Sequence, residues 1–398
     1  MNIPLVRPAP PRLSQHIAEL EALEASGIFS NFGPVNTRFE DEMMERFFGG
    51  QGACMTVCNA TIGLMLAIKE VVGDPALGEG GGRKYALMPS FTFAAAAHAA
   101  LWCGLTPLLC DVDPGTWAAD PNAESDLLAK YAGKIAVVIP YSTFGYPIEL
   151  DRYTRIAIQL GVPVVVDGAA SLGTADAAGR GFGTGFAGSV VYSMHATKSF
   201  AVGEAGVIYS ADAERIARLR TMNGFGFGSP RTATMAGING KVCEVVALLG
   251  RLRLADYDQV VAHRASLFHR YREALPELQY QVEAAGVQAH QFVPALLPSR
   301  VKGSKAAIRA QLTDRGIATG AYFSPHLMEQ PYFQKTCVAG PLPVCDDISA
   351  RMLSLPLYDT MTFEEVDYVV AHLRELLGEA EKPSSAKPSS QVQRVSLV

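Results

Sequence analysis

Short apolar runs and helical patterns alternate along the chain between about residue 40 and residue 210. The apolar runs lack the polar alternation of half-exposed strands, which is typical of strands that are buried on both faces of a sheet. Strands are expected at 86–89, 107–113, 134–140, 162–167, 189–193 and 205–210. Helical patterns at 93–103 and 151–161 separate some of these strands. This alternation predicts an α/β fold with a mostly parallel sheet that is covered by helices.

The pattern changes after about residue 240, where the spacing of apolar residues predicts one long helix over 243–275. Its apolar side is expected to face inward with Leu248, Leu249, Leu252, Leu254 and Tyr257, and its polar side outward with Arg251, Arg253 and Asp258. A smaller α+β unit should follow. Its last helix is predicted to begin at Thr362, with Glu365 completing a capping box, and to end at Gly378.

These changes of pattern predict three parts. A large domain with an N-terminal segment spans 1–245, and the long connecting helix with a small C-terminal domain spans 246–380. The segment 381–398 is rich in Ser, Pro and Lys and is expected to be a disordered tail.

Composition and charge exclude several classes of protein. The chain has 398 residues, of which 49% are hydrophobic and 18% charged, so it can bury a large core. A net charge of −5 with no basic run argues against a nucleic-acid surface. The seven cysteines lack the paired spacing of a zinc site, so we expect reduced thiols, no metal and a cytoplasmic location. No signal peptide or membrane span is apparent in the sequence.

Two polar residues lie just where buried strands end or beyond them. Asp167 closes the run at 162–167, and Lys198 lies in a loop rich in Ser, Thr, His and Gly after the next strand. A lysine in such a place more often extends to the surface, but together with the aspartate it suggests a pyridoxal-phosphate site. That cofactor needs an amine to hold its aldehyde as a Schiff base, a carboxylate beside its pyridine nitrogen, and a phosphate cradle.

The phosphate cradle is expected at the start of the helix that follows Asn59. Asn59 is the predicted N-cap, and the N–H groups of Ala60 and Thr61, with the Thr61 hydroxyl, would form an anion site. Taken alone, this pattern more often marks an ordinary capped helix. Ser193 could add a phosphate contact and Phe93 could stack on the pyridine ring, although such an aromatic is more often core. The match to GxGxxG at 183–188 precedes a strand, so we interpret it as a turn.

These segments together resemble the DegT/StrS sugar aminotransferase family of fold type I pyridoxal-phosphate enzymes, from about residue 3 to residue 378. The matching segments are NFGPVNTRFEDEM (31–43), VCNATIGLMLAI (57–68), MPSFTFAAAAHAALWCGLTPLLCDVDP (88–114), VVVDGAASLGT (165–174), YSMHATKSFAVGEAG (192–206), GINGKVCE (237–244), YFSPHLMEQPYF (322–333) and LSLPLYDTMT (353–362).

The resemblance implies a role for each matching residue. Lys198 is the Schiff-base lysine, and Asp167 is the partner of the pyridine nitrogen. The implied cofactor-binding residues are Ala60, Thr61, Phe93, Asp167, Ser193, His195, Lys198 and Asn239. Asn239 matches an asparagine that reaches the phosphate of the neighbouring subunit, which implies a homodimer with shared active sites. The implied substrate pocket is lined by Asn31, Phe32, Gly33, Lys241 and Tyr322.

Three positions depart from the family pattern. Ala170 stands where the family usually has Gln or His near the phenolic oxygen of the cofactor. Gly240 and Lys241 replace the usual Tyr-Arg, and Met328 occupies a place that histidine often holds. Some relatives replace the lysine with histidine and dehydrate sugars, so the retention of Lys198 favours transamination.

The sequence therefore predicts a pyridoxal-phosphate aminotransferase. Its expected amino donor is glutamate, and its expected acceptor is a keto-sugar linked to a nucleotide. Two alternatives remain open at this point: an acceptor that is a cyclitol or another ketone without a nucleotide, and a cofactor-binding regulator without turnover.

Overall fold

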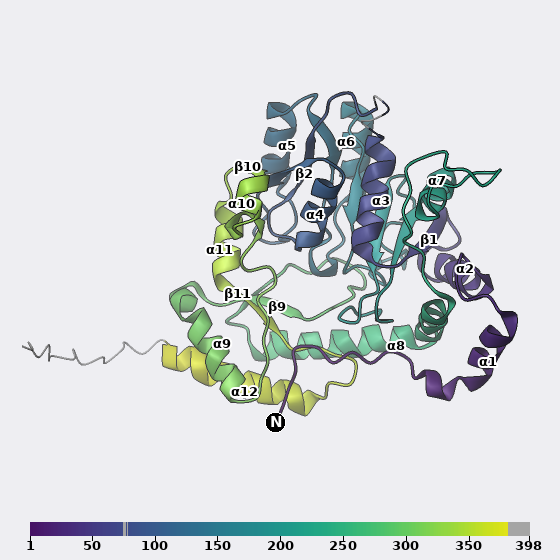
Figure 1. Cartoon of the computed structure of the whole chain (residues 1–398). Coiled ribbons are helices and arrows are strands. Elements are labelled where there is room, and N and C mark those ends of the chain that lie inside the picture. The colour runs from purple at the N-terminus through teal and green to yellow at the C-terminus, as the bar shows by residue number, and fades with distance from the viewer. Residues whose placement is uncertain (75–76, 78, 381–398) are drawn as a thin grey trace, which may run out of the picture.

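The computed structural model describes residues 1–74, 77 and 79–380 of the chain. The tail predicted at 381–398 lies outside the described residues. Figure 1 shows a layered upper part that contains the large sheet, the long helix α8 (Glu244–Ala274) running beneath it, and further helices around the two ends of α8.

The large sheet forms from two four-stranded groups. The first has the order β10-β3-β2-β4 and is parallel throughout, and the second has the order β5-β6-β7-β1 with β7 antiparallel to both of its neighbours. Parallel bridges from Val138 to Val164 and from Tyr141 to Asp167 join β4 to β5. The strands are β1 (Ala53–Val57), β2 (Tyr85–Pro89), β3 (Thr106–Cys110), β4 (Ile135–Val138), β5 (Val165–Asp167), β6 (Ser189–Ser193), β7 (Gly206–Ser210) and β10 (Val338–Ala339). The prediction of an α/β fold with a mostly parallel sheet is confirmed.

Helices cover both faces of this sheet, and the strands contribute side chains to both sides alternately. Val166 and Val190 belong to a hydrophobic cluster with α5 and α6, whereas Val165 and Val191 belong to a second cluster with α3 and α4. This alternation follows from the two-residue period of a strand. The helices of this part are α3 (Ala60–Val72), α4 (Ala94–Trp102), α5 (Pro121–Lys130), α6 (Leu150–Leu160) and α7 (Ala213–Asn223).

Much of the C-terminal part packs around one end of α8, in a hydrophobic cluster that Phe91, Val112, Trp117 and Phe144 of the large part join. Its antiparallel sheet has the order β11-β9-β8. Its elements are β8 (Gln279–Tyr280), β9 (Val293–Leu296), α9 (Lys305–Asp314), α10 (Phe333–Thr336), α11 (Pro343–Arg351), β11 (Met352–Leu355) and α12 (Phe363–Ala380). At the other end of α8 lie α1 (Ile17–Ser26) and α2 (Pro34–Phe48), as Figure 1 shows. The short 3₁₀ segments are Leu13–Gln15, Thr143–Gly145, Ser299–Ser304 and Leu327–Glu329.

Most of the predicted boundaries hold. The long helix predicted at 243–275 is confirmed as α8, and the Thr362 capping box is confirmed by reciprocal bonds with Glu365 of 2.9 and 3.2 Å. However, α12 continues beyond Gly378 to Ala380. The strand predicted at 162–167 begins only at Val165. No helix among the described residues has both the length and the apolar character needed to cross a membrane.

One prediction for α8 is wrong. Arg253 was expected to face solvent, but its side chain is 2% exposed and donates to the carbonyl oxygen of Ala9. It also pairs with Asp359 at 3.3 Å, and Asp359 lies beyond β11. Its burial is tolerated because the N-terminal segment and the C-terminal part both supply oxygen acceptors for the guanidinium group.

The close packing of α2 on α8 leads to a stability prediction. A Cβ at Gly250 would stand 2.3 Å from the buried ring of Phe39, so we expect Gly250→Ala to destabilise the protein by about 1–3 kcal/mol through overpacking. Gly378→Ala in α12 is the matched control, because a Cβ there meets nothing within 4 Å and alanine favours a helix by about 1 kcal/mol. The melting temperatures of the two variants should therefore move in opposite directions, and equal shifts would contradict this account.

Candidate active site

Asp167 is the last residue of β5 and lies at the carboxyl end of the parallel strands. Its backbone is fixed on one side of the strand, because its N–H donates to Pro140 and its carbonyl oxygen accepts from Ser142, both at 2.9 Å. Its side chain is buried, and Oδ1 accepts from the N–H of Ala169 at 3.1 Å. Ligands of open α/β sheets bind beyond the carboxyl ends of the strands, and Asp167 lies at that edge.

Lys198 lies in the loop that follows β6, the strand next to β5. The loop turns tightly, because the Lys198 N–H donates to the carbonyl oxygen of His195 at 2.8 Å and His195 bridges to Gly203. The Nζ amine donates to Oε1 of Gln291 at 3.0 Å. His195 itself contacts Thr197 through Nδ1 at 2.9 Å and Glu204 through Nε2 at 3.4 Å.

Asp167 and Lys198 influence each other's proton affinity. Burial raises the pKa of Asp167 to about 6, although the Ala169 N–H and the positive charge of Lys198 oppose this rise. Burial also lowers the pKa of Lys198 to about 8, and the negative charge of Asp167 opposes that fall. An amine with a pKa near neutrality has a substantial unprotonated fraction, which a nucleophile requires. The two residues predicted as catalytic therefore lie close enough to interact electrostatically.

The predicted phosphate cradle is assembled where α3 begins. Asn59 is confirmed as the N-cap, because its Oδ1 accepts from the N–H of Ile62 at 2.9 Å. Gly206 on β7 pairs with Ser193, and a Cβ at Gly206 would stand 2.9 Å from the backbone nitrogen of Ala60. A glycine is therefore needed for the close approach that brings Ala60 and Ser193 to one place. The first N–H groups of a helix have no intrahelical acceptors, and they attract anions.

Phe93 lies at the N-cap of α4 with its side chain exposed. Its ring centroid is 6.1 Å from that of Phe323, and Phe323 also contacts the ring of Tyr141. Tyr141 pairs with Asp167 across the strands, so Phe93 is linked to the site through two aromatic rings. Tyr322 stacks on Phe292, with ring centroids 5.0 Å apart. Phe292 directly follows Gln291 in the sequence.

Asn239 and Lys241 border the start of α3. The carbonyl oxygen of Gly240, between them, accepts from the N–H of Cys58 at 2.6 Å. The Lys241 amine donates to Asn239 Oδ1 at 2.6 Å and lies 4.9 Å from the ring of Phe225. Asn239 is exposed, and no hydrogen bond among the described residues joins it to Lys198.

The N-terminal residues of the predicted substrate pocket are held by an acidic residue that motif analysis missed. Asn31 and Phe32 adopt left-handed backbone angles, and Gly33 then begins the approach to α2. The fully buried carboxylate of Glu244 accepts from the N–H groups of Val35 at 2.7 Å and Asn36 at 3.2 Å, which caps α2. A Cβ at Gly33 would stand 2.7 Å from this carboxylate carbon.

The same N-terminal segment lies apart from the amine of its own chain in the hydrogen-bond network of the described residues. Among the described residues, no hydrogen bond or ring contact connects Asn31, Phe32 or Gly33 with the loop of Lys198. The segment lines an open cavity of about 940 Å³. In the sequence, the only hint of Glu244 was an acidic residue near the start of the helix predicted at 243–275. Nothing in the sequence pointed to Gln291.

The structure also shows the surroundings of Ala170 and Met328, two of the positions that depart from the family pattern. Ala170 is buried and offers only a methyl group where a polar side chain would reach the site. The Met328 N–H donates to Ser90 Oγ at 3.3 Å, and its side chain packs against two hydrophobic clusters. Neither residue supplies a side-chain hydrogen bond.

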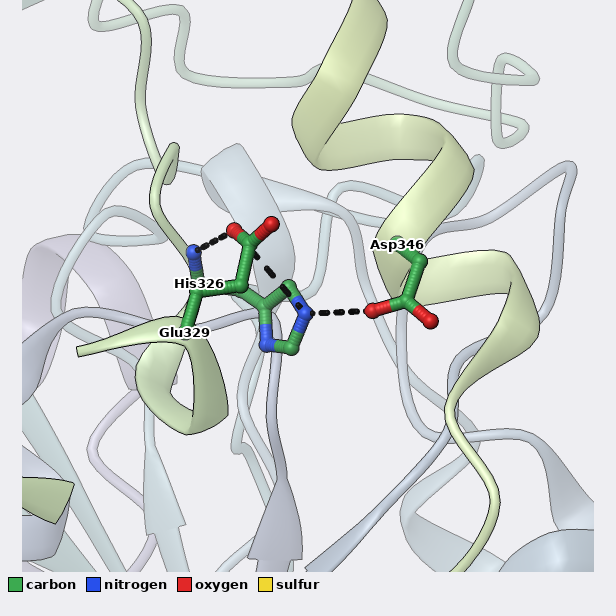
Figure 2. Close-up of side chains that lie close together, drawn as sticks. All are labelled: His326, Glu329 and Asp346. Carbon is green, nitrogen blue, oxygen red and sulfur yellow. Dashed lines mark hydrogen bonds and ion pairs between the residues drawn. The ribbon is translucent and has the colours of Figure 1, made fainter. Parts of the chain in front are cut away.

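His326, Glu329 and Asp346 form a group whose spacing suits a metal ion (Figure 2). However, both ring nitrogens of His326 have partners: Nδ1 contacts Ser90 Oγ, and Nε2 contacts Asp346 Oδ1, each at 2.9 Å. The His326 N–H also donates to Glu329 at 2.9 Å. We interpret the group as a polar link between the end of β2 and α11, because it satisfies its own hydrogen bonds.

The residues present fit pyridoxal phosphate. Among the described residues the buried Asp167 carboxylate accepts one hydrogen bond, from the Ala169 N–H, and its pKa stays raised despite the charge of Lys198, so a protonated pyridine nitrogen would supply the hydrogen-bonded cation that it lacks. Lys198 supplies the amine, while Ala60, Thr61 and Ser193 surround the start of α3 where a phosphate would be held. The structure therefore brings together most of the predicted cofactor residues within one chain.

Comparisons with known proteins agree with this geometry. The model of the DegT/DnrJ/EryC1/StrS aminotransferase family matches residues 12–374. The chain is similar to the crystal structure of a putative PLP-dependent aminotransferase from Bacillus cereus, with 37% identity, a TM-score of 0.87, and coverage of 94% of this chain and 100% of the other.

Two further similarities involve sugars. The structure of DesI determined with its TDP-sugar product has 29% identity and a TM-score of 0.83, with 96% of this chain and 94% of the other covered. The dTDP-4-amino-4,6-dideoxy-D-glucose transaminase of Escherichia coli is 26% identical over 394 residues, with 95% and 98% covered.

The raised pKa of Asp167 makes a prediction for the protein without cofactor. An exposed aspartate has a pKa of about 3.9, so the folded state loses stability as pH rises from about 4 to about 6 and Asp167 must ionise in a buried place. Asp167→Asn removes this cost and should raise the melting temperature more at pH 8 than at pH 4. A gain that is the same at both values would contradict the assigned burial of the charge.

Proposed function

This chain belongs to the DegT/DnrJ/EryC1/StrS aminotransferase family and is a pyridoxal-phosphate-dependent aminotransferase, and we propose that it aminates a nucleotide-linked keto-sugar with L-glutamate as donor. The observation that carries the proposal is the pair of buried Asp167 and partly buried Lys198 at the carboxyl edge of the sheet, where each charge acts on the other. The sugar part rests on two similar proteins, one a dTDP-sugar transaminase and one determined with a TDP-sugar product.

In this proposal each residue of the site has one task. When bound, the cofactor supplies an aldehyde that accepts the amino group and a ring that withdraws electrons. Lys198 would hold the cofactor through its amine, and the same amine, once free, would move the proton at the substrate carbon. Asp167 would keep a proton on the pyridine nitrogen, while Ala60, Thr61 and Ser193 would hold the phosphate and Phe93 would cover the ring.

We propose further that the active unit is a homodimer with shared sites. Asn239 is exposed and lies beside the start of α3, the place assigned to the phosphate. An exposed polar side chain at that place is available to a second copy of the chain across a two-fold axis. Within the part of the chain that the structure describes, no hydrogen bond or ring contact joins Asn31, Phe32 or Gly33 to their own Lys198 loop, which also favours completion of the site by a partner.

All seven cysteines are free thiols in the structure. Unpaired cysteines are typical of proteins that work in a reducing compartment, which supports the proposal of a cytoplasmic location. The proposed two-domain division, with the boundary at residue 245, is supported by a hydrophobic cluster made mostly of residues that follow this boundary.

The donor half of the reaction can be tested by visible absorption. Addition of L-glutamate to the loaded enzyme should bleach the absorption band of the bound cofactor, and a keto-sugar nucleotide should restore it. Lys198→Ala should form no such band, because no other amine is assigned to hold the cofactor. A band that persists in this variant would reject the role of Lys198. Restoration by a cyclitol ketone but not by keto-sugar nucleotides would reject the proposed acceptor.

Shared active sites predict complementation between two inactive variants. Lys198→Ala and Asn239→Ala should each lose most activity, and a refolded equal mixture should regain about a quarter of the wild-type activity, since half of the dimers would carry one intact site. The control is a mixture of Lys198→Ala with Asp167→Asn. If Asp167 and Lys198 act in the same site of one subunit, that mixture gains nothing. Equal results from the two mixtures would contradict sharing through Asn239.

A further inference from the structure

The amine of Lys198 has a hydrogen-bond partner from a distant part of the chain. Nζ donates to Oε1 of Gln291 at 3.0 Å, across 93 positions of sequence. Gln291 lies in the segment between α8 and β9, so it reaches the amine from the C-terminal part rather than from the large sheet. A protonated lysine amine only donates, so the amide oxygen, not the nitrogen, must face it.

The other end of the Gln291 amide is also held. Its Nε2 donates to Thr197 Oγ1 at 3.1 Å, and the Thr197 hydroxyl lies 2.9 Å from His195 Nδ1. The Thr197 N–H donates to the same ring nitrogen at 3.2 Å, so that nitrogen acts as an acceptor. The Thr197 hydroxyl therefore donates to His195 and accepts from Gln291, which fixes the amide with its oxygen toward Lys198.

The backbone around Gln291 is held from α8. The buried guanidinium group of Arg264 donates to the carbonyl oxygens of His290 at 3.1 Å and Gln291 at 3.0 Å. Arg264 is in turn paired with Asp359 at 2.6 Å. Both the backbone and the side chain of Gln291 are therefore fixed before any substrate binds.

We propose that Gln291 is a positioning residue that holds the free amine of Lys198 in place during the reaction. The need arises because the amine would be free, no longer bonded to the cofactor, once a substrate amine had taken its place, and it would then have to carry a proton at a defined point. Ala170, in the turn three residues after Asp167, has only a methyl group and cannot take this task. The inference rests on the proposed role of Lys198.

This role has a consequence in the protein without cofactor. Loss of the amide oxygen removes an acceptor from a buried ammonium group, so Gln291→Leu should lower the pKa of Lys198 by about one unit, which is a tenfold weaker affinity for the proton. Gln291→Glu should raise that pKa, because it adds a negative charge beside the amine. The other ionisable groups around the amine, Asp167 on β5 and His195 with Glu204 in the loop, are unchanged in both variants.

The decisive experiment measures the pH dependence of Lys198 acetylation by acetic anhydride in the cofactor-free protein, with mass spectrometry as readout. The same variants are then loaded, and kcat and KM for L-glutamate are measured from the absorption of the bound cofactor. For Gln291→Leu we expect the lower labelling pKa, a kcat about tenfold lower, and a KM within about twofold of the wild type. Gln288→Leu is the matched control, because Gln288 precedes Gln291 by three positions and its Nε2 donates to Phe144, not to Lys198.

Each outcome separates the inference from the assignment on which it rests. If Gln291→Leu changes neither the labelling pKa nor kcat, or if Gln288→Leu changes them equally, Gln291 does not position the amine. Opposite pKa shifts in Gln291→Leu and Gln291→Glu would support the inference, because a merely structural loss would not reverse its sign. A cofactor band that survives in Lys198→Ala would instead reject the role of the lysine itself.

Discussion

The pairing of a buried carboxylate, Asp167, with a partly buried amine, Lys198, at one edge of the sheet is the constraint on which the site depends. Asp167 and Lys198 end up there because β5 and β6 are parallel neighbours, so that the carboxyl end of one strand and the loop after the other meet. The low polarity of this edge shifts the pKa of each group toward its neutral form, and each charge partly offsets the shift of the other. A pyridinium nitrogen is the partner that such a carboxylate lacks, and an accessible unprotonated amine is what an aldehyde cofactor requires.

The long helix α8 connects this edge with the rest of the molecule. Its first residue, Glu244, caps α2 and fixes the segment that carries Asn31 to Gly33. Farther along the same helix lie two buried arginines, Arg253 and Arg264. Both pair with Asp359 of the C-terminal part. A buried arginine is costly unless its charge is paired, so the carboxylate and carbonyl oxygens that these two side chains contact fix the relative positions of the elements that supply them. The C-terminal part can then place Gln291 against Lys198.

Glycine residues permit the close approaches that this arrangement needs. Gly250 lets α2 lie on α8, Gly206 lets α3 approach the sheet, and Gly33 leaves space for the carboxylate of Glu244. At each of these places a Cβ would stand within 3.0 Å of another atom. The approaches at Gly206 and Gly33 lie beside residues assigned to the site. A side chain at either glycine would therefore disturb both the packing and the position of those site residues.

The sequence by itself determined the alternation of strands and helices, the long helix, the cap at Asn59 and the capping box at Thr362, because these depend on local periodicity and on contacts a few residues apart. It also pointed to Asp167, Lys198, Ala60, Thr61 and Ser193, since strand ends and helix starts of an α/β sheet converge by topology. It did not place Arg253, whose burial depends on acceptors from Ala9 and Asp359, far away in the chain. Gln291 and Glu244 were likewise decided by the tertiary structure, because the partners that give them a role come from distant elements and leave no periodic or spacing signal.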